Sequence, residues 1–267
     1  MIKRTMTDVN VLKGLQNVRD RINSVCLRIG KENKPRLVAV SKTKPKEMLI
    51  SAYEAGQRHF GENYIQELVE KSKNPEILEH CKDIQWHFIG HIQRNKVNKL
   101  VSVPGLFIVE TVDNIKLAST LNESWGNLNK THKLNVMVQV NTSEEKEKSG
   151  CSPKEVNELA SHIFKNCKNL NLFGLMTIGQ FGYDSSKGPN PDFLCLVSCR
   201  ENVSKNLELN PDDLELSMGM SDDFEHAIEL GSTNVRVGSS IFGFRERKPT
   251  KDSTKDLTQA MEEINVK

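Results

Sequence analysis

The stretch Arg36-Leu-Val-Ala-Val-Ser-Lys-Thr-Lys-Pro45 decides how the rest of the chain is interpreted. Its apolar and β-branched residues predict a buried β-strand over residues 36–41. Pro45 then opens a helix that we expect to run to Ala55, because proline is favoured in the first turn of a helix and Gly56 follows as a stop signal. One strand followed by one helix is therefore the unit to look for elsewhere.

The same unit recurs along the chain. Further strands are predicted at 59–61, 84–89, 106–110, 134–141 (the longest), 170–175, 214–217 and 234–237. Helices are predicted at 9–29 (before the first strand), 64–71, 93–101, 115–121, 153–164, 191–207 and 223–230. Such alternation implies parallel strands joined by helical crossovers. About eight units in 267 residues suit a closed (β/α)8 barrel with an extra N-terminal helix, and an open doubly wound sheet is the alternative.

Charge balance and the absence of long apolar runs argue against a nucleic-acid-binding or membrane-spanning protein. The 37 Lys+Arg and 35 Asp+Glu nearly cancel, so no broad field favours nucleic acid or acidic membranes. No apolar run approaches the ~20 residues of a membrane-spanning helix, and no signal-peptide core is present. We expect one domain over residues 1–245, a charged and flexible tail over 246–267, and a cytoplasmic location, with a mitochondrial pool as the alternative.

The six cysteines are scattered without a CxxC pair. Two of them, Cys195 and Cys199, are four residues apart, but two thiols alone do not make a zinc site. We therefore expect reduced thiols and no metal site.

In a barrel, function gathers where strands end, and the first predicted strand leads to Lys42. Alternation places Lys42 on the face of Val38 and Val40, where burial of an ammonium is costly. A desolvated amine is also the group that forms a Schiff base with a carbonyl compound. The alternative is a surface lysine that closes the strand. Lys44, beside Pro45, is expected in the exposed turn.

The strand predicted at 234–237 ends in a turn of small residues. Gly238 lets the backbone turn, and Ser239 and Ser240 then begin a short helical segment whose N–H groups and hydroxyls can bind an anion. The loop after the last strand is where barrels often bind phosphate.

The turn over 217–221, Ser-Met-Gly-Met-Ser, is similar in composition and leads into another helix. Each turn alone is typical of an ordinary helix cap. Arg236 shares the face of Asn234 and is expected to be buried. A reactive Lys42, a buried Arg236 and a phosphate cup on adjoining strands together predict a pyridoxal 5′-phosphate (PLP) site.

Several motifs in this chain, in the same order, resemble the family of pyridoxal phosphate homeostasis proteins. They are Ser41-Lys-Thr-Lys-Pro45, Phe60-Gly-Glu-Asn-Tyr-Ile-Gln-Glu67, Trp86-His-Phe-Ile-Gly90, Gly174-Leu-Met-Thr-Ile178, Leu216-Ser-Met-Gly-Met-Ser221 and Val235-Arg-Val-Gly238. The resemblance covers residues 37–245. Members of the family look like the N-terminal barrel of alanine racemase standing alone, which implies a TIM barrel of that type with PLP as cofactor.

The resemblance also implies roles for individual residues. Lys42 should carry PLP as a Schiff base, and Arg236 should face the pyridine nitrogen. The phosphate should lie against Ser217, Gly219, Gly238 and Ser239, and the ring pocket should be lined by Asn63 and Met218. The family often has Thr where this chain has Ser239 or Ser240, and either hydroxyl can donate to phosphate.

An arginine beside the pyridine nitrogen leaves that nitrogen unprotonated, so the ring is a weak electron sink. Racemisation needs a second acid or base, which alanine racemase takes from a Tyr of a second domain. None of Tyr53, Tyr64 and Tyr183 is expected at a strand end with a helper nearby. We therefore expect a non-catalytic protein without catalytic residues that buffers PLP or delivers it, with PLP-dependent apoenzymes as possible recipients. The resemblance implies a barrel that works as a monomer, with a dimer as the alternative.

Two alternatives stay open. One is a cryptic PLP-dependent racemase or lyase with His87, His91 or Tyr64 as base, although core or capping roles are favoured for the two histidines. The other is a phosphosugar-type barrel enzyme with an unmodified lysine. The loop over 179–191 either covers the site or is a surface feature, and the second is favoured.

Overall fold

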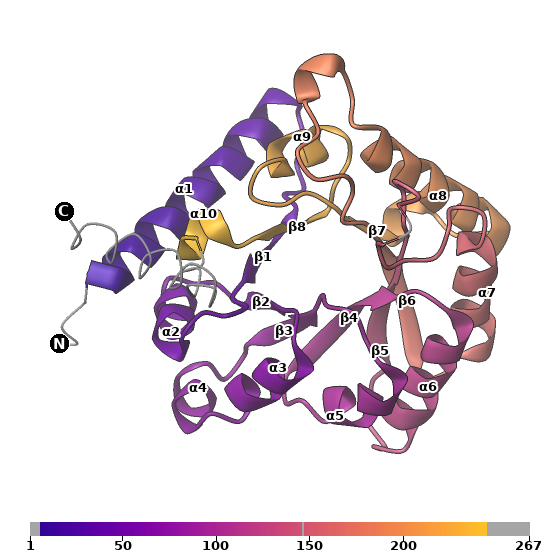
Figure 1. Ribbon diagram of the computed structural model, residues 1–267, viewed down its shortest axis with the longest axis horizontal. Coiled ribbons are helices and arrows are strands. Elements are labelled where there is room, and N and C mark those ends of the chain that lie inside the picture. The colour runs from indigo at the N-terminus through magenta and orange to yellow at the C-terminus, as the bar shows by residue number, and fades with distance from the viewer. Residues whose placement is uncertain (1–5, 146, 245–267) are drawn as a thin grey trace, which may run out of the picture.

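Eight parallel strands form a closed barrel in this computed structural model, which describes residues 6–145 and 147–244. The strands pair in chain order, and the last closes on the first (Figure 1). They are β1 (Arg36–Val40), β2 (His59–Glu62), β3 (Gln85–Phe88), β4 (Leu106–Val112), β5 (Leu134–Gln139), β6 (Leu170–Met176), β7 (Glu215–Ser217) and β8 (Asn234–Val237). The predicted barrel is confirmed, and the open sheet is excluded.

Helices surround the barrel on the outside (Figure 1). They are α1 (Met6–Arg28), α2 (Lys46–Glu54), α3 (Ile65–Ser72), α4 (Pro75–His80), α5 (Val97–Val101), α6 (Ile115–Gly126), α7 (Val156–Asn166), α8 (Pro191–Leu207), α9 (Phe224–Glu229) and α10 (Ser239–Phe242). Short 3-10 turns are η1 (Arg94–Lys96), η2 (Ser185–Lys187) and η3 (Pro211–Asp213). The extra N-terminal helix is α1, as predicted.

One helix was missed from the sequence, and the prediction for one strand is wrong in detail. Helix α4 was not predicted, although Asn74 caps it by accepting hydrogen bonds from the N–H groups of Glu76 and Ile77, with Pro75 at its first position. Strand β5 has six residues and is not the longest, because β4 and β6 have seven each. The chain leaves β5 after Gln139 and enters the loop that precedes α7.

Each strand presents one face to the helices and the other to the barrel interior. On β8, Val235 and Val237 pack into the large hydrophobic core that contains the helices, while Arg236 hydrogen-bonds across the interior. The interior contains a smaller apolar cluster of Ile108, Met137 and Met176. Buried polar side chains, among them Glu110 and Arg236, also lie in the interior.

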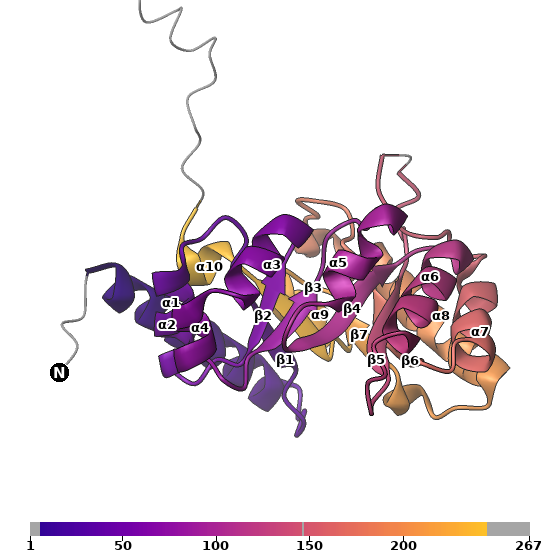
Figure 2. The ribbon, with the colours of Figure 1, turned by 90° about the horizontal axis from the view of Figure 1, so that it is seen from below.

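Helix α1 lies against α10, and both views place them side by side (Figures 1 and 2). The contact is close because a Cβ on Gly14 would lie 2.6 Å from the carbonyl oxygen of Ser240. A glycine in α1 therefore allows the backbone of α10 to approach, and the N-terminal helix buttresses the turn that follows β8.

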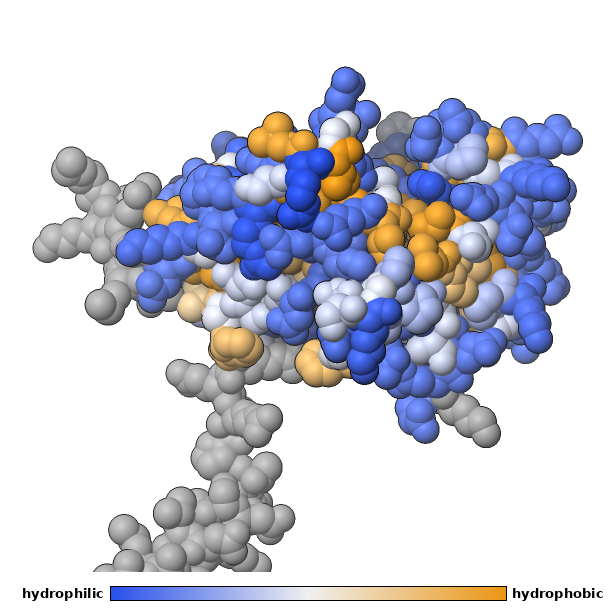
Figure 3. All heavy atoms as spheres, turned by 90° about the horizontal axis from the view of Figure 1, so that it is seen from above, coloured by the Kyte–Doolittle hydropathy of each residue, from blue (hydrophilic) through white to orange (hydrophobic). Residues whose placement is uncertain are grey.

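None of the described helices is long and apolar enough to cross a membrane. On the face drawn in Figure 3, hydrophobic side chains gather in small patches between hydrophilic ones. The tail predicted over 246–267 lies outside the described residues.

Candidate functional site

Lys42 lies in a tight turn directly after β1. The strand ends at Val40, Thr43 adopts a left-handed φ of 63°, and the N–H of Lys44 donates to the carbonyl of Ser41 at 3.0 Å. Lys42 is half-buried. The strand alternation that placed Lys42 in an apolar row therefore stops before it, and the turn positions the residue instead.

A buried cluster of charges holds this turn. Lys71 Nζ donates at 2.7 Å to the carbonyl of Ser41, to Glu62 Oε1 and to Glu67 Oε1. The same oxygen of Glu67 accepts from the backbone N–H of Thr43 at 2.6 Å. Burial raises the pKa of Glu62, and the charge of Lys71 opposes that rise. The residues on either side of Lys42 are thus tied to α3, a link that sequence reasoning missed.

Asn63 follows β2 at the same end of the barrel. A Cβ on Gly90 would lie 1.9 Å from the carbonyl oxygen of Asn63, so only glycine permits this approach of the two loops. The side-chain oxygen of Asn63 is buried and has no hydrogen-bond partner within the described chain. An orphaned buried acceptor is unfavourable, and it indicates a place where a ligand can donate.

The turn after β8 lies against the end of β1. A Cβ on Gly238 would approach the carbonyl oxygen of Val40 to 3.2 Å, and the N–H of Gly238 donates to Ser221 Oγ at 3.2 Å. Helix α10 begins at Ser239, as predicted, so its first N–H groups lie at this turn. The structure therefore brings Gly238 and Ser239 close to the strand that leads to Lys42.

The turn after β7 joins the same region through the backbone. Gly219 has a φ of 94°, and its carbonyl accepts from the N–H of Arg236 at 3.0 Å. Met218 is fully buried and packs in the hydrophobic core. Only the backbone of Met218, and not its side chain, can therefore line the predicted ring pocket.

Arg236 is buried inside the barrel, as predicted, with 4% of its surface exposed. Nη1 donates to Ser217 Oγ at 2.6 Å and Nη2 to the carbonyl of Thr177 at 2.8 Å. Burial lowers the pKa of Arg236, and the charges of Glu110 and Asp223 act in the opposite direction. A guanidinium stays charged in proteins and has more N–H donors than these two contacts use.

The side chain of Ser217 points into the interior rather than to the turn. Its hydroxyl donates to Glu110 Oε2 at 2.5 Å and accepts from Arg236 and from Asn234 Nδ2, the latter at 2.9 Å. A hydroxyl has one proton to donate, and here Glu110 receives it. If Ser217 contacts the phosphate, as predicted, it must therefore do so through its backbone.

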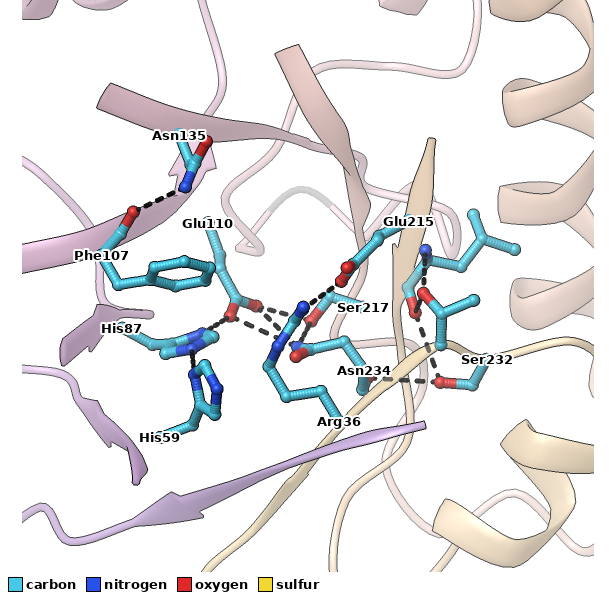
Figure 4. A network of polar contacts seen from close by, with 12 residues as sticks. Arg36, His59, His87, Phe107, Glu110, Asn135, Glu215, Ser217, Ser232 and Asn234 are labelled. Atoms are coloured by element: carbon cyan, nitrogen blue, oxygen red, sulfur yellow. Dashed lines mark hydrogen bonds and ion pairs between the residues drawn. The ribbon is translucent and has the colours of Figure 1, made fainter. Parts of the chain in front are cut away.

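The interior network continues to the opposite end of the barrel (Figure 4). Glu110 Oε1 lies 2.5 Å from His87 Nδ1, and His87 Nε2 lies 2.9 Å from His59 Nδ1. Burial raises the pKa of Glu110, but His87, Arg236 and Ser217 together bring that pKa below its usual value. The predicted core role of His87 is confirmed. Its partnership with Glu110 was missed by the sequence reasoning.

His91 and Tyr64 lie on the outside of the mouth. They share a pocket of about 350 Å³ with Asn63, Lys96 and Lys99, between α3 and α5. Tyr64 follows β2 by two residues, and His91 lines the same pocket. The expectation that no tyrosine near a strand end has a helper stays a prediction.

The loop over 179–191 is tied to neighbouring elements at both ends. The N–H of Gln180 donates to Asp192 Oδ2 at 2.7 Å, and the N–H of Asn190 donates to His226 Nε2 at 3.0 Å. Between these anchors, Phe181 is 81% exposed. The choice between a covering and a surface role stays a prediction.

Comparisons with known proteins agree with this fold. The family described as "Alanine racemase, N-terminal domain" matches residues 14–246. The pyridoxal phosphate homeostasis protein of Homo sapiens is 54% identical over 243 residues, which are 89% of this chain and 88% of the relative. That of Bos taurus is 52% identical and covers 94% of this chain and 93% of its own.

Among solved structures, PipY of Synechococcus elongatus with PLP bound superposes with a TM-score of 0.70 at 28% identity. The match covers 87% of this chain and all of PipY. The family model, the two relatives and the solved structure each cover more than four fifths of this chain. The chain belongs to the pyridoxal phosphate homeostasis protein family, with the barrel of the alanine racemase N-terminal domain.

Proposed function

We propose that this protein binds PLP at the mouth of its barrel and serves PLP homeostasis without turning over an amino-acid substrate. Its relatives carry that name, and PipY is solved with PLP bound. When bound, PLP supplies an aldehyde that condenses with a primary amine and a phosphate that needs N–H donors. The observation that carries the proposal is the close approach of the Gly238 turn to the end of β1, which leads to Lys42.

The residues at the mouth fit such a group. Asn63 offers a buried acceptor without a partner in the described chain, and Arg236 has N–H donors beyond those its contacts use. The turn before α10 has glycine where a Cβ would lie 3.2 Å from the carbonyl oxygen of Val40, and the first N–H groups of α10 follow this turn.

Each residue then has one task. Lys42 Nζ is the amine that forms the Schiff base, and Arg236 donates to the pyridine nitrogen. The phosphate is held by the hydroxyl of Ser239 and the backbone of Ser217, Gly219 and Gly238. The ring lies between Asn63 and the backbone of Met218.

The permanent charge of Arg236 supports a role without turnover. Because a guanidinium does not give up its proton, the pyridine nitrogen beside it stays unprotonated and the ring withdraws electrons weakly. This disfavours the carbanion chemistry on which amino-acid racemases and lyases depend.

A cryptic racemase or lyase is the second candidate, and the pocket of Tyr64 and His91 favours it. Either side chain is a possible acid or base beside Asn63. To decide, the PLP-loaded protein is incubated with amino acids in deuterium oxide, and the α-hydrogen is followed by NMR. We expect no exchange. Exchange that disappears in Tyr64→Phe would establish the enzyme.

We further propose that residues 1–245 are the complete PLP-binding unit, that it works as a monomer, and that it lies in the cytoplasm. The barrel closes within one chain, and all six cysteines are free thiols, as suits a reducing compartment. PLP-dependent apoenzymes are the proposed recipients. Sedimentation of the full chain and of residues 1–245, each with PLP, tests the first two statements.

The central experiment is borohydride reduction of the PLP-loaded protein followed by peptide mass spectrometry. We expect a phosphopyridoxyl group on Lys42, its loss in Lys42→Ala and its retention in the matched control Lys44→Ala. A barrel enzyme with an unmodified lysine would stay colourless and unlabelled. An adduct that persists at Lys44 in Lys42→Ala would overturn the assignment of Lys42.

A further inference from the structure

Two fully buried, opposite charges face each other inside the barrel without touching. Glu110 lies on β4 and Arg236 on β8, and the Ser217 hydroxyl on β7 bridges them at 2.5 Å and 2.6 Å. Glu110 has no exposed surface and Arg236 has 4%. Because each buried charge is unfavourable alone, the two stabilise each other.

Within the described residues, the groups that face Glu110 include no cation besides Arg236 and the histidines. His87 of β3 faces Oε1, Ser217 of β7 faces Oε2, and Asn234 Nδ2 of β8 lies 3.3 Å from Oε1. His59 of β2 lies behind His87. Apart from the histidines, Arg236 is the cation that acts on Glu110 within the described residues.

The hydroxyl of Ser217 uses its one proton and accepts two hydrogen bonds, so its orientation is fixed. Ser217 donates its one proton to Glu110 and accepts from both Arg236 and Asn234. If the carboxylate were absent, the hydroxyl proton could rotate toward another acceptor, and the oxygen lone pairs would turn away from Nη1. The carboxylate therefore fixes the orientation in which Ser217 receives the guanidinium.

A planar guanidinium held at two points has little freedom left. Ser217 holds Nη1 and the carbonyl of Thr177 holds Nη2, so the plane of the Arg236 head group is set by its two anchors. We propose that Glu110, acting through Ser217, is the positioning residue that orients and neutralises Arg236 beneath the pyridine nitrogen of PLP. This inference rests on the proposed function.

The test uses the PLP-loaded full chain and the variants Glu110→Gln and Ser217→Ala. The matched control is Ser232→Ala, which removes another buried hydroxyl between β7 and β8 that donates to the carbonyl of Met218 instead. The measurement is the pH midpoint at which the visible absorbance of the bound cofactor changes. Borohydride trapping at Lys42 is run in parallel.

We expect Glu110→Gln to lower that midpoint, because the charge of Arg236 beneath the ring is then no longer compensated through Ser217, and this disfavours the protonated, positively charged form of the linkage between Lys42 and PLP. We expect a shift on the order of one pH unit, which corresponds to about 1.4 kcal/mol. Ser217→Ala should also move the midpoint, and the double variant should move it no further than the larger single one, since both act through one contact. Ser232→Ala should match the unsubstituted protein.

Unchanged midpoints in Glu110→Gln and Ser217→Ala, additive shifts, or an equal shift in Ser232→Ala would overturn the inference. If Glu110→Gln does not fold, the comparison of Ser217→Ala with Ser232→Ala decides. Absence of a Lys42 adduct in the unsubstituted protein would refute the proposed function instead, so the two failures are distinguishable.

Discussion

His59 and His87 meet inside the barrel, with His59 Nδ1 2.9 Å from His87 Nε2 and their rings at 80° to each other. One of these two nitrogens must accept, so the pair contains at least one ring that is not fully protonated. Burial, with the charges of His87 and Arg36, lowers the pKa of His59 to about 3. His59 therefore stays neutral in the folded protein down to about pH 3 and is an acid-sensitive point of the network.

This depressed pKa predicts how stability depends on pH. Unfolded His59 titrates near its ordinary pKa of 6.5, whereas folded His59 stays neutral down to about 3. Its contribution is therefore complete above pH 6.5 and is lost as the pH falls, by up to about 1.4 kcal/mol per pH unit. In His59→Gln we expect the free energy of unfolding to fall less steeply between pH 6.5 and about 5, where carboxylates are still charged. Urea unfolding measures this, and parallel slopes in the two proteins would contradict it.

Arg236→Gln tests whether Arg236 is needed to bind PLP or only changes the electronic properties of its ring. If Lys42 and the turns after β7 and β8 hold PLP, the variant keeps the cofactor and changes its visible absorbance. It also removes one of the charges that stabilise the buried Glu110 carboxylate, so we expect the free energy of unfolding to fall by about 3–5 kcal/mol. Arg236→Lys, which keeps the charge, should lose less stability. Complete loss of PLP from folded Arg236→Gln would make Arg236 a binding residue.

Because Lys71 belongs to the buried charge cluster that holds the Lys42 turn, its loss should lower the free energy of unfolding more than loss of Lys46. Lys71→Met leaves the fully buried Glu62 without its cation and should lower the free energy of unfolding by about 3–5 kcal/mol. Adding Glu62→Gln should restore part of that loss. The control is Lys46→Met, whose partner Glu76 is about half exposed, and we expect a loss of at most about 1 kcal/mol. Chemical denaturation compares them, and equal losses would show that the cluster does not stabilise the turn.

Most of the fold could be predicted because its signals are local. The bounds predicted for the strand at 234–237 and the helix at 191–207 match β8 and α8. Alternation also predicted the burial of Arg236, since Val235 and Val237 occupy the opposite face. Periodicity tells which face a side chain lies on, and in a closed barrel that is enough to find the interior.

The partners across the interior could not be predicted in the same way. Glu110, Ser217 and Arg236 come from three strands far apart in sequence, and their contact depends on the stagger of the whole barrel. The sequence therefore placed Ser217 at the phosphate by resemblance, while its side chain lies inside. Met218 followed the same strand alternation to the opposite face, which is the hydrophobic core.

The proposed contact of the phosphate with the turn after β7 can be tested through a pair of glycines. Gly219 and Gly231 both have left-handed φ angles, 94° and 102°, so alanine is strained at either position by about 1–2 kcal/mol. They differ in space: a Cβ on Gly219 would lie 2.6 Å from Ala227 Cβ, whereas one on Gly231 would meet nothing within 4 Å in the described chain. Gly219→Ala must therefore shift its turn away from α9, which should weaken PLP binding as well as stability. Gly231→Ala should cost stability alone. Titration with PLP by absorbance, beside urea unfolding, checks this, and equal PLP affinity in the two variants would place the phosphate away from the turn of Gly219.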